Sequence, residues 1–169
     1  MKGMIRWVLP LLLLAPLGVG VAMAASSSSS SSGTVKAVKS KSFGTILVSS
    51  TGRTLYRYTI DHKNSNRCSS DATCNKYWPP LLVKAGAKPT AGAGAKAAML
   101  GTIKAKNGMR QVTYGGWPLY TFAGDSAAGQ TKGQAFGKEW YVVSTSGALV
   151  KAAIATSTTT TTSGGSAWG

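Results

Sequence analysis

The sequence predicts an all-β domain of two pseudo-symmetric repeats that form a small antiparallel sandwich or barrel. Short runs of β-branched and aromatic residues alternate with glycine-rich turns. No stretch has the 3.6-residue periodicity of an amphipathic helix of ordinary length. One eight-residue phrase occurs twice, as "TLYRYTID" (residues 54–61) and "PLYTFAGD" (residues 118–125), which indicates an internal duplication.

The chain begins with a positively charged start, an apolar run and the small-residue site "AMA" at residues 22–24. These three features predict that residues 1–24 are a secretory signal peptide. An uncleaved membrane anchor is the alternative, but two prolines and two glycines interrupt the apolar run. We therefore expect a secreted or cell-envelope protein that has no membrane span after signal cleavage.

Two low-complexity segments flank the predicted domain. Residues 25–34 are rich in serine and residues 156–169 in threonine, serine and glycine, and neither has apolar periodicity. Such segments cannot bury enough apolar surface to offset the entropy of ordering, so we expect a flexible segment and a disordered tail. Residues 35–155 remain as a single β domain, with repeat one at 43–84 and repeat two at 99–151.

The strands of this domain can be assigned in order. The run "GTILV" (44–48) ends at "SSTG", and "TLYRY" (54–58) alternates as a half-buried strand does. The strands "RQVTY" (110–114) and "WPLYTF" (117–122) flank Gly115 and Gly116, which can supply the positive φ angles of a two-residue hairpin turn. "EWYVVS" (139–144) and "ALVKAAI" (148–154) read as closing strands. Residues 84–98 lack large side chains and read as a linker or surface loop, with a possible short helix at 95–99.

The two repeats align through their motifs. "FGTI" (43–46) matches "LGTI" (100–103), and a glycine turn, the repeated phrase, a polar loop and a tryptophan (Trp78 or Trp140) follow in each copy. On this alignment the second copy carries an extra strand, "RQVTY". The first copy carries a loop with two cysteines instead.

Cys68 and Cys74 are the two cysteines of the chain. In an exported protein such a pair predicts a disulfide. Half of a metal site is the alternative, but metal-binding cysteines usually stand two to four residues apart, and His62 is the one available nitrogen ligand. We expect no metal site and no cofactor.

The repeated phrase predicts an aromatic core strand followed by an aspartate corner. Tyr56 and Tyr58 point to one side of their strand, as do Tyr120 and Phe122. Asp61 and Asp125 come where each strand should end, where a carboxylate can accept hydrogen bonds from backbone N–H groups.

Two functional alternatives use the same aspartates, Asp61 and Asp125. Paired carboxylates could hydrolyse a glycan if their pKa values differ, or could hold a hard cation. His62, beside Asp61, lacks a nucleophile motif around it and reads as an exposed loop residue.

The charge balance is strongly basic. The chain has 19 Lys and Arg against 4 Asp and Glu, a net charge of +15, and the signal peptide would remove two basic residues and no acidic one. Scattered cations favour contact with an anionic polymer of the cell wall or envelope. No motif for specific nucleic-acid recognition is present.

Several of these motifs together resemble a bacterial secreted-repeat family, described as predicted lipoproteins with a Yx(FWY)xxD motif. They are the twin phrases, the segments "YWPPLL" and "QVTYGGWPLYTFAGD", and "WYVVS". The resemblance implies an exported or envelope-attached protein and supplies no catalytic residues. This chain has no cysteine directly at the end of its apolar run, so it departs from the lipoprotein members.

These observations predict an exported cell-envelope binding or structural module without catalytic activity. The alternatives are a carboxylate-dependent hydrolase acting on an envelope glycan, and an envelope metal or redox accessory protein.

Overall fold

A computed structural model describes residues 33–153 of the chain. The predictions for residues 1–24, for most of 25–34 and for 156–169 lie outside these residues. Within the described part the protein is all-β, with short strands and little helix, as predicted. The strands are β1 Thr34–Ser40, β2 Gly44–Ser49, β3 Tyr56–Tyr58, β4 Leu82–Val83, β5 Thr90–Ala91, β6 Leu100–Lys104, β7 Arg110–Tyr114, β8 Trp117–Pro118 and β9 Trp140–Val142. The helices are α1 Ala72–Tyr77 and the 3-10 turns η1 Cys68–Ser70, η2 Ala97–Met99 and η3 Phe136–Lys138.

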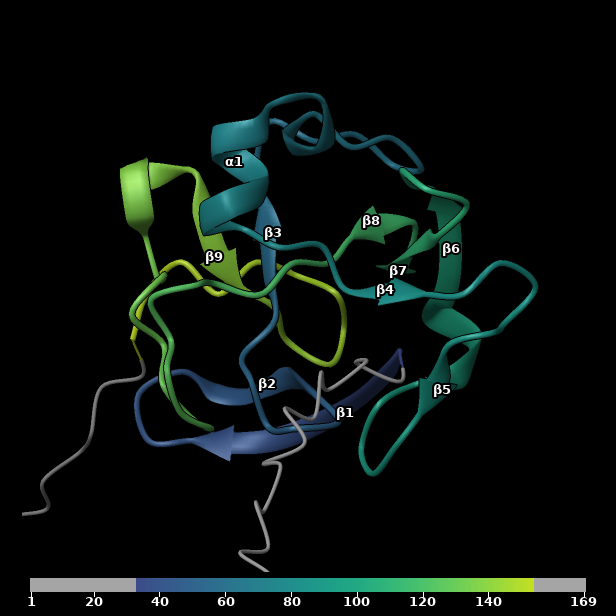
Figure 1. Cartoon of the computed structure of the whole chain (residues 1–169). Helices are drawn as coiled ribbons and strands as arrows, with labels where there is room; N and C mark the ends of the chain where they lie inside the picture. The colour runs from purple at the N-terminus through teal and green to yellow at the C-terminus, as the bar shows by residue number, and fades with distance from the viewer. Residues whose placement is uncertain (1–32, 154–169) are drawn as a thin grey trace, which may run out of the picture.

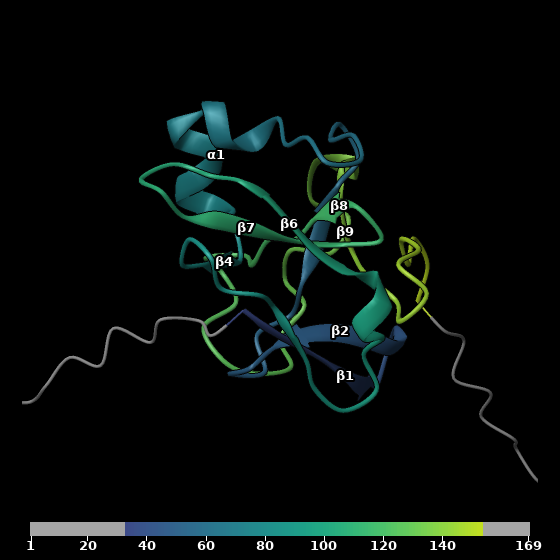
Figure 2. The same ribbon diagram turned by 90° about the vertical axis from the view of Figure 1, so that its right-hand side faces the viewer.

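The strands form three small sheets. Their orders are β2-β1-β5, β3-β9 and β4-β7-β6, with β8 paired to β7. Figure 1 shows the hairpin β1–β2 at the bottom, the β4–β6–β7–β8 group on the right, β3 near the centre and β9 to its left. Figure 2 shows β1 and β2 as one layer below β4, β6 and β7. This arrangement fits the sandwich of the prediction, and no sheet within residues 33–153 closes into a barrel.

Each repeat consists of a hairpin, a glycine turn and the motif strand. Strands β1 and β2 form the hairpin of the first repeat, and β6 and β7 form that of the second. Gly52 and Gly116, with φ angles of 80° and 82°, make the turn that leads from each hairpin to its tyrosine phrase. β1 is therefore the counterpart of β6, and β2 is the counterpart of β7.

This pairing corrects the predicted alignment of the repeats. The match of "FGTI" with "LGTI" is wrong, because "FGTI" opens the second strand of its hairpin and "LGTI" lies in the first strand of its own. "RQVTY" is consequently no extra strand, since it corresponds to β2. The prediction missed β1, where only Val35 is buried and Val38 is 38% exposed, so the strand carries little periodic signal.

The structure differs from the predicted secondary structure in three further segments. The segment 148–153 forms a single bridge, from Leu149 to Val143, in place of the predicted closing strand. Within the predicted linker, β5 pairs in parallel with β1 over two residues. The six-residue helix α1 lies in the cysteine loop, where Asp71 caps it by accepting from the backbone N–H groups of Thr73 and Cys74.

The apolar core has two parts. One fills the space between the two hairpin layers and consists of Val35, Leu47, Leu55, Leu81, Val83, Val112, Tyr114, Leu119 and Val143. The other collects the aromatic residues of the repeated phrases and is described below. No helix in the described part of the chain is long and apolar enough to span a bilayer.

Candidate functional site

The two repeated phrases meet at their first tyrosines. Tyr56 and Tyr120 form an antiparallel bridge, in which the Tyr56 N–H donates to the Tyr120 carbonyl (2.8 Å) and the Tyr120 N–H donates to the Tyr56 carbonyl (3.1 Å). Both residues are fully buried. The bridge therefore places equivalent residues of the two repeats side by side at the centre of the molecule.

Each tyrosine hydroxyl binds the aspartate of the other repeat. The Tyr56 Oη donates to Asp125 Oδ2 at 2.7 Å, and the Tyr120 Oη donates to Asp61 Oδ2 at 2.9 Å. Asp61 and Asp125 are 2% and 0% exposed. The tyrosine of each phrase thus bonds to the aspartate of the other phrase. The spacing of the residues within one phrase did not predict this crossed pairing.

The second oxygen of each carboxylate binds the loop that follows it. Asp61 Oδ1 accepts from the backbone N–H of Arg67 at 2.6 Å, and Asp125 Oδ1 accepts from that of Lys132 at 2.8 Å. Each carboxylate thus bonds to the backbone six or seven residues further along its own chain segment. Each aspartate consequently joins its own loop to the tyrosine of the other repeat.

Burial shapes the electrostatics of these pairs. It raises the pKa of both Asp61 and Asp125, and the hydrogen bonds from the phenols and the backbone N–H groups offset only part of this effect. Burial also raises the pKa of Tyr56 and Tyr120, and the neighbouring carboxylates raise it further. The phenols therefore remain protonated donors.

The second aromatic residue of each phrase also crosses between repeats. Trp78 and Trp140 lie face to face, with ring centroids 3.9 Å apart and an interplanar angle of 1°. Tyr58 stacks on Trp140 at 4.3 Å, and Phe122 packs on Trp78 at 4.4 Å. The four rings form a continuous stack in the order Tyr58, Trp140, Trp78, Phe122. Tyr58 and Phe122 thus each pack on the tryptophan of the other repeat, whereas Tyr56 and Tyr120 each meet the tryptophan of their own repeat edge-on.

The cysteines form the predicted disulfide. Cys68 and Cys74 are bonded, with their Cα atoms 5.3 Å apart, and the bond ties η1 to α1. Cys68 is buried in the aromatic cluster, where its neighbours include Trp78 and Tyr56. The disulfide thereby fixes the first polar loop against the ring stack.

The buried pairs offer little access for chemistry. Both oxygens of Asp61 and Asp125 have hydrogen-bond donors within the protein, and the carboxylates do not reach solvent. His62 is exposed and its backbone pairs with Ser65. Among residues 33–153, no group of three or more His, Cys, Asp or Glu side chains could hold a metal ion.

Two exposed rings outside the motif border the stack. Tyr77 and Phe136 are 50% and 54% exposed. With the edges of Trp78 and Trp140 and with Asp71 they line a hollow of about 280 Å³. The rings able to contact a ligand on this face are therefore not those of the repeated phrases.

Sequence reasoning also missed two arginines of the first repeat, Arg53 and Arg57. The buried Arg57 guanidinium lies 3.8 Å from the centre of the Trp117 ring and donates to the Gly147 carbonyl at 2.6 Å. Burial lowers the pKa of Arg57 to about 10, and the charge of Asp61 opposes this. The sequence does show that these two positions differ between the repeats. The second repeat has Trp117 and Thr121 where the first has Arg53 and Arg57.

Comparison with known proteins supports the repeat. No curated protein and no solved structure matches the chain. The sequence pattern of one family matches it twice, at residues 37–82 and 101–144. These ranges start in β1 and at its counterpart β6, and the same 24-residue interval leads from 37 to Asp61 and from 101 to Asp125. Because the two ranges cover more than half of the sequence, the chain belongs to the family described as a secreted repeat of unknown function.

Proposed function

We propose that this secreted protein is a non-catalytic module that binds an anionic polymer of the cell envelope through its basic surface. The distribution of charge after folding supports this proposal best. Two of the four acidic residues, Asp61 and Asp125, are buried. Apart from Lys2 and Arg6, the chain has 17 basic residues, of which only Arg57 is buried. The surface of the domain thus carries sixteen basic residues and two acidic ones, Asp71 and Glu139.

The lysines lie on several elements. Lys39 lies near the end of β1 and Lys41 in the turn to β2, and Lys104 ends β6 while Lys106 lies in the turn to β7. All four are exposed. Cations spread in this way can each contact a different charge of one long polymer, so weak contacts add up along the chain.

The proposal also assigns a role to the segments on either side of the described residues. Residues 1–24 would serve as the export signal, residues 25–32 as a flexible spacer, and residues 156–169 as a flexible tail, whereas Thr34, which the sequence assigned to the spacer, begins strand β1. The domain between them would then bind the polymer, with its two repeats as the scaffold; the first repeat includes β1 and so begins before the predicted residue 43.

A hydrolase has weaker support. A carboxylate-dependent hydrolase needs two carboxylates that reach the substrate. Asp61 and Asp125 are 2% and 0% exposed, and each already accepts hydrogen bonds at both oxygens. The crossed pairs are better suited to holding the two repeats together.

Cosedimentation with isolated cell walls tests the proposal. The chain from residue 25 onward should bind intact walls in 0.1 M salt and be released in 1 M salt, because the screening length falls from about 10 Å to about 3 Å. Walls stripped of their anionic polymers should bind it weakly. Salt-independent binding, or equal binding to stripped walls, contradicts the proposal.

Two matched variants test whether the charge acts collectively. Lys39→Gln with Lys41→Gln and Lys104→Gln with Lys106→Gln each remove two exposed charges from a different turn, and each should weaken binding by a similar factor. Release of wall fragments by the wild-type protein, lost in Asp61→Asn with an unchanged Tm, would instead establish the hydrolase.

A further inference from the structure

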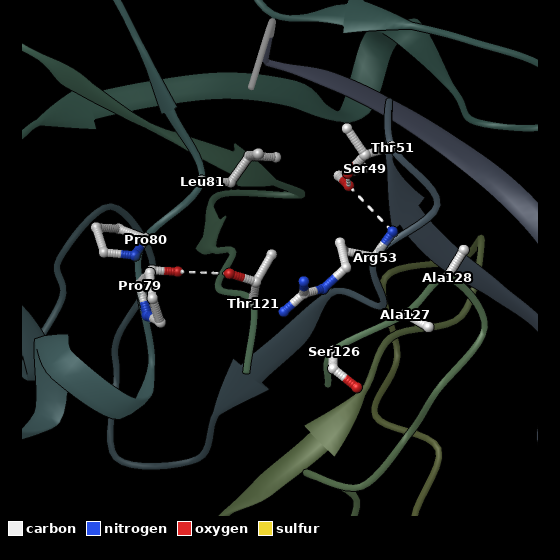
Figure 3. A pocket seen from close by; sticks show the side chains of 10 residues that line it. All are labelled: Ser49, Thr51, Arg53, Pro79, Pro80, Leu81, Thr121, Ser126, Ala127 and Ala128. Atoms are coloured by element: carbon white, nitrogen blue, oxygen red, sulfur yellow. Dashed lines mark hydrogen bonds between the residues drawn. The ribbon is translucent and has the colours of Figure 1, made fainter. Parts of the chain in front are cut away.

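The two repeats differ where their arginines lie. In one half of the molecule Arg57 packs on Trp117 and fills the space beside the motif strand. The pseudo-twofold relation makes Thr121 the counterpart of Arg57, and Arg53 the counterpart of Trp117. The stacked pair of Arg57 and Trp117 in one half of the molecule thus corresponds to Thr121 and Arg53 in the other half, where one of the two side chains is small. Here the structure has an open pocket of about 440 Å³ (Figure 3).

Among residues 33–153, Arg53 is the one charged residue that lines this pocket. Figure 3 shows its guanidinium reaching into the space between Thr121 and Ser126. Ser49 and Thr51 line the pocket as well. The walls are otherwise made of prolines, alanines and Leu81, so no acidic side chain borders the opening.

The guanidinium retains unused donors. Its Nη2 donates to the Phe122 carbonyl at 3.1 Å, and its Nε is buried with no hydrogen-bond partner in the described part of the chain. Arg57 also has an unpartnered Nε, but its guanidinium lies against the Trp117 ring and donates to Gly147. Arg53 stacks on no aromatic ring of the described residues.

The nearest carboxylate is already engaged. The charge of Arg53 is close enough to Asp125 to lower the pKa of that carboxyl, although burial raises it more. Both Asp125 oxygens accept from other donors, the Tyr56 hydroxyl and the Lys132 N–H. The Arg53 charge therefore lacks a dedicated hydrogen-bonded counterion.

A hydroxyl donor is available as well. Ser49 Oγ and Thr51 Oγ1 lie 3.0 Å apart and share one hydrogen bond. Because that bond uses one of their two hydrogens, the other remains free to donate. A guanidinium fork beside a hydroxyl suits the oxygens of a phosphate group, which can accept several bonds at once.

We propose that the pocket around Arg53, Thr51 and Thr121 binds an oxyanion, and that this oxyanion is a phosphodiester group of the anionic envelope polymer. The identity of the polymer rests on the proposed function, whereas oxyanion binding in the pocket does not. The scattered lysines supply long-range attraction, and Arg53 supplies one position at which the polymer is held in register.

Titration with dimethyl phosphate at constant ionic strength tests the pocket. The resonances of the Arg53 Nε–H and of the amides of residues 126–128 should shift together in NMR spectra of the mature protein. Acetate should bind more weakly, because a planar carboxylate holds its two oxygens closer together than a tetrahedral phosphodiester holds its two unesterified oxygens, and so spans the guanidinium and the hydroxyl less well. Equal or tighter binding of acetate overturns the assignment to phosphate.

Matched variants separate the pocket from general surface charge. Arg53→Gln should weaken dimethyl phosphate binding about tenfold or more, as expected for the loss of hydrogen bonds to a charged group. Arg67→Gln removes the same charge from an exposed side chain and should leave binding unchanged. Equal losses in both variants overturn the proposal.

A second variant guards against a folding defect in Arg53→Gln. Ala127→Trp keeps Arg53 and adds a bulky ring at an exposed rim position, so it should block binding without lowering the Tm. Unimpaired binding in Ala127→Trp contradicts the proposal.

The wall assay distinguishes the two proposals. Salt-sensitive wall binding by a protein whose pocket ignores dimethyl phosphate rejects the pocket alone. A pocket that binds dimethyl phosphate in a protein that ignores cell walls rejects the envelope function alone.

Discussion

The crossed hydrogen bonds between repeats can be tested by replacing one atom at a time. Tyr120→Phe removes the hydroxyl that donates to Asp61 Oδ2 at 2.9 Å and leaves the buried ring in place. Tyr56→Phe does the same to the bond with Asp125. Neither substitution creates a cavity larger than one oxygen atom. The Tyr56 hydroxyl also accepts from the backbone N–H of Gly133 at 3.2 Å, so Tyr56→Phe removes that bond as well, and only a double-mutant cycle isolates its bond with Asp125.

The expected magnitude follows from the charge of the acceptor. A hydrogen bond to a charged group contributes about 1.5–3 kcal/mol to stability, and a neutral one about 0.5–1.5 kcal/mol. Tyr120→Phe should therefore cost about 1.5–3 kcal/mol in the wild type. In an Asp61→Asn background, where the acceptor is neutral, it should cost about 1 kcal/mol less.

Urea unfolding at pH 7, with the disulfide intact, measures these free energies. The decisive comparison is between two double-mutant cycles. Tyr120 with Asp61 should show coupling of about 1 kcal/mol, whereas Tyr56 with Asp61 should be additive within about 0.5 kcal/mol. Tyr56 should couple to Asp125 instead.

Two results would refute this reasoning. Additive behaviour of Tyr120 with Asp61 would mean that the hydroxyl and the carboxylate do not interact in solution. Coupling of Tyr56 with Asp61 would mean that each phrase bonds within its own repeat.

Three further predictions concern the same core. Trp140→Ala should lower the free energy of unfolding by about 3–5 kcal/mol, because the ring is buried between Trp78 and Tyr58. Phe136 is 54% exposed, so Phe136→Ala should cost far less. Equal losses of stability in urea unfolding would contradict the ring stack. Replacing both cysteines by serine should cost about 2 kcal/mol, and reduction of the wild type should reproduce that loss. Because burial raises the folded-state pKa of Asp61 and Asp125 above the ordinary 3.8, their stabilising contribution is full below pH 3.8 and is lost as the pH rises through the folded pKa. Wild type should therefore gain stability relative to Asp61→Asn and Asp125→Asn on acidification from pH 7, and a constant or falling difference would show that the pKa values are not raised.

The charge balance and the compartment were readable before the structure was known, because both depend on composition and on short segments. Which charges remain at the surface was not readable. Asp61 and Asp125 are indistinguishable from surface acids in the sequence, and only their burial leaves Asp71 and Glu139 as the acidic residues of the surface.

The sequence alone determined the features that arise between near neighbours. Gly115 and Gly116 have φ angles of 59° and 82° and form the hairpin turn that their dipeptide predicted. Cys68 and Cys74 stand six residues apart and are bonded. The repeated phrase revealed the duplication, and the short β-branched and aromatic runs between glycine-rich turns indicated the all-β class.

The tertiary structure decided which repeat each side chain contacts. Tyr56 and Asp125 are 69 residues apart, and Tyr120 and Asp61 are 59 apart. Strand alternation fixes the side of a strand to which a ring points, but it does not fix the strand that will lie opposite. The same limit hid the Arg53 pocket. Thr121 and Arg53 come from different repeats and line this pocket together. At the equivalent positions of the other half of the molecule, Arg57 and Trp117 stack on each other.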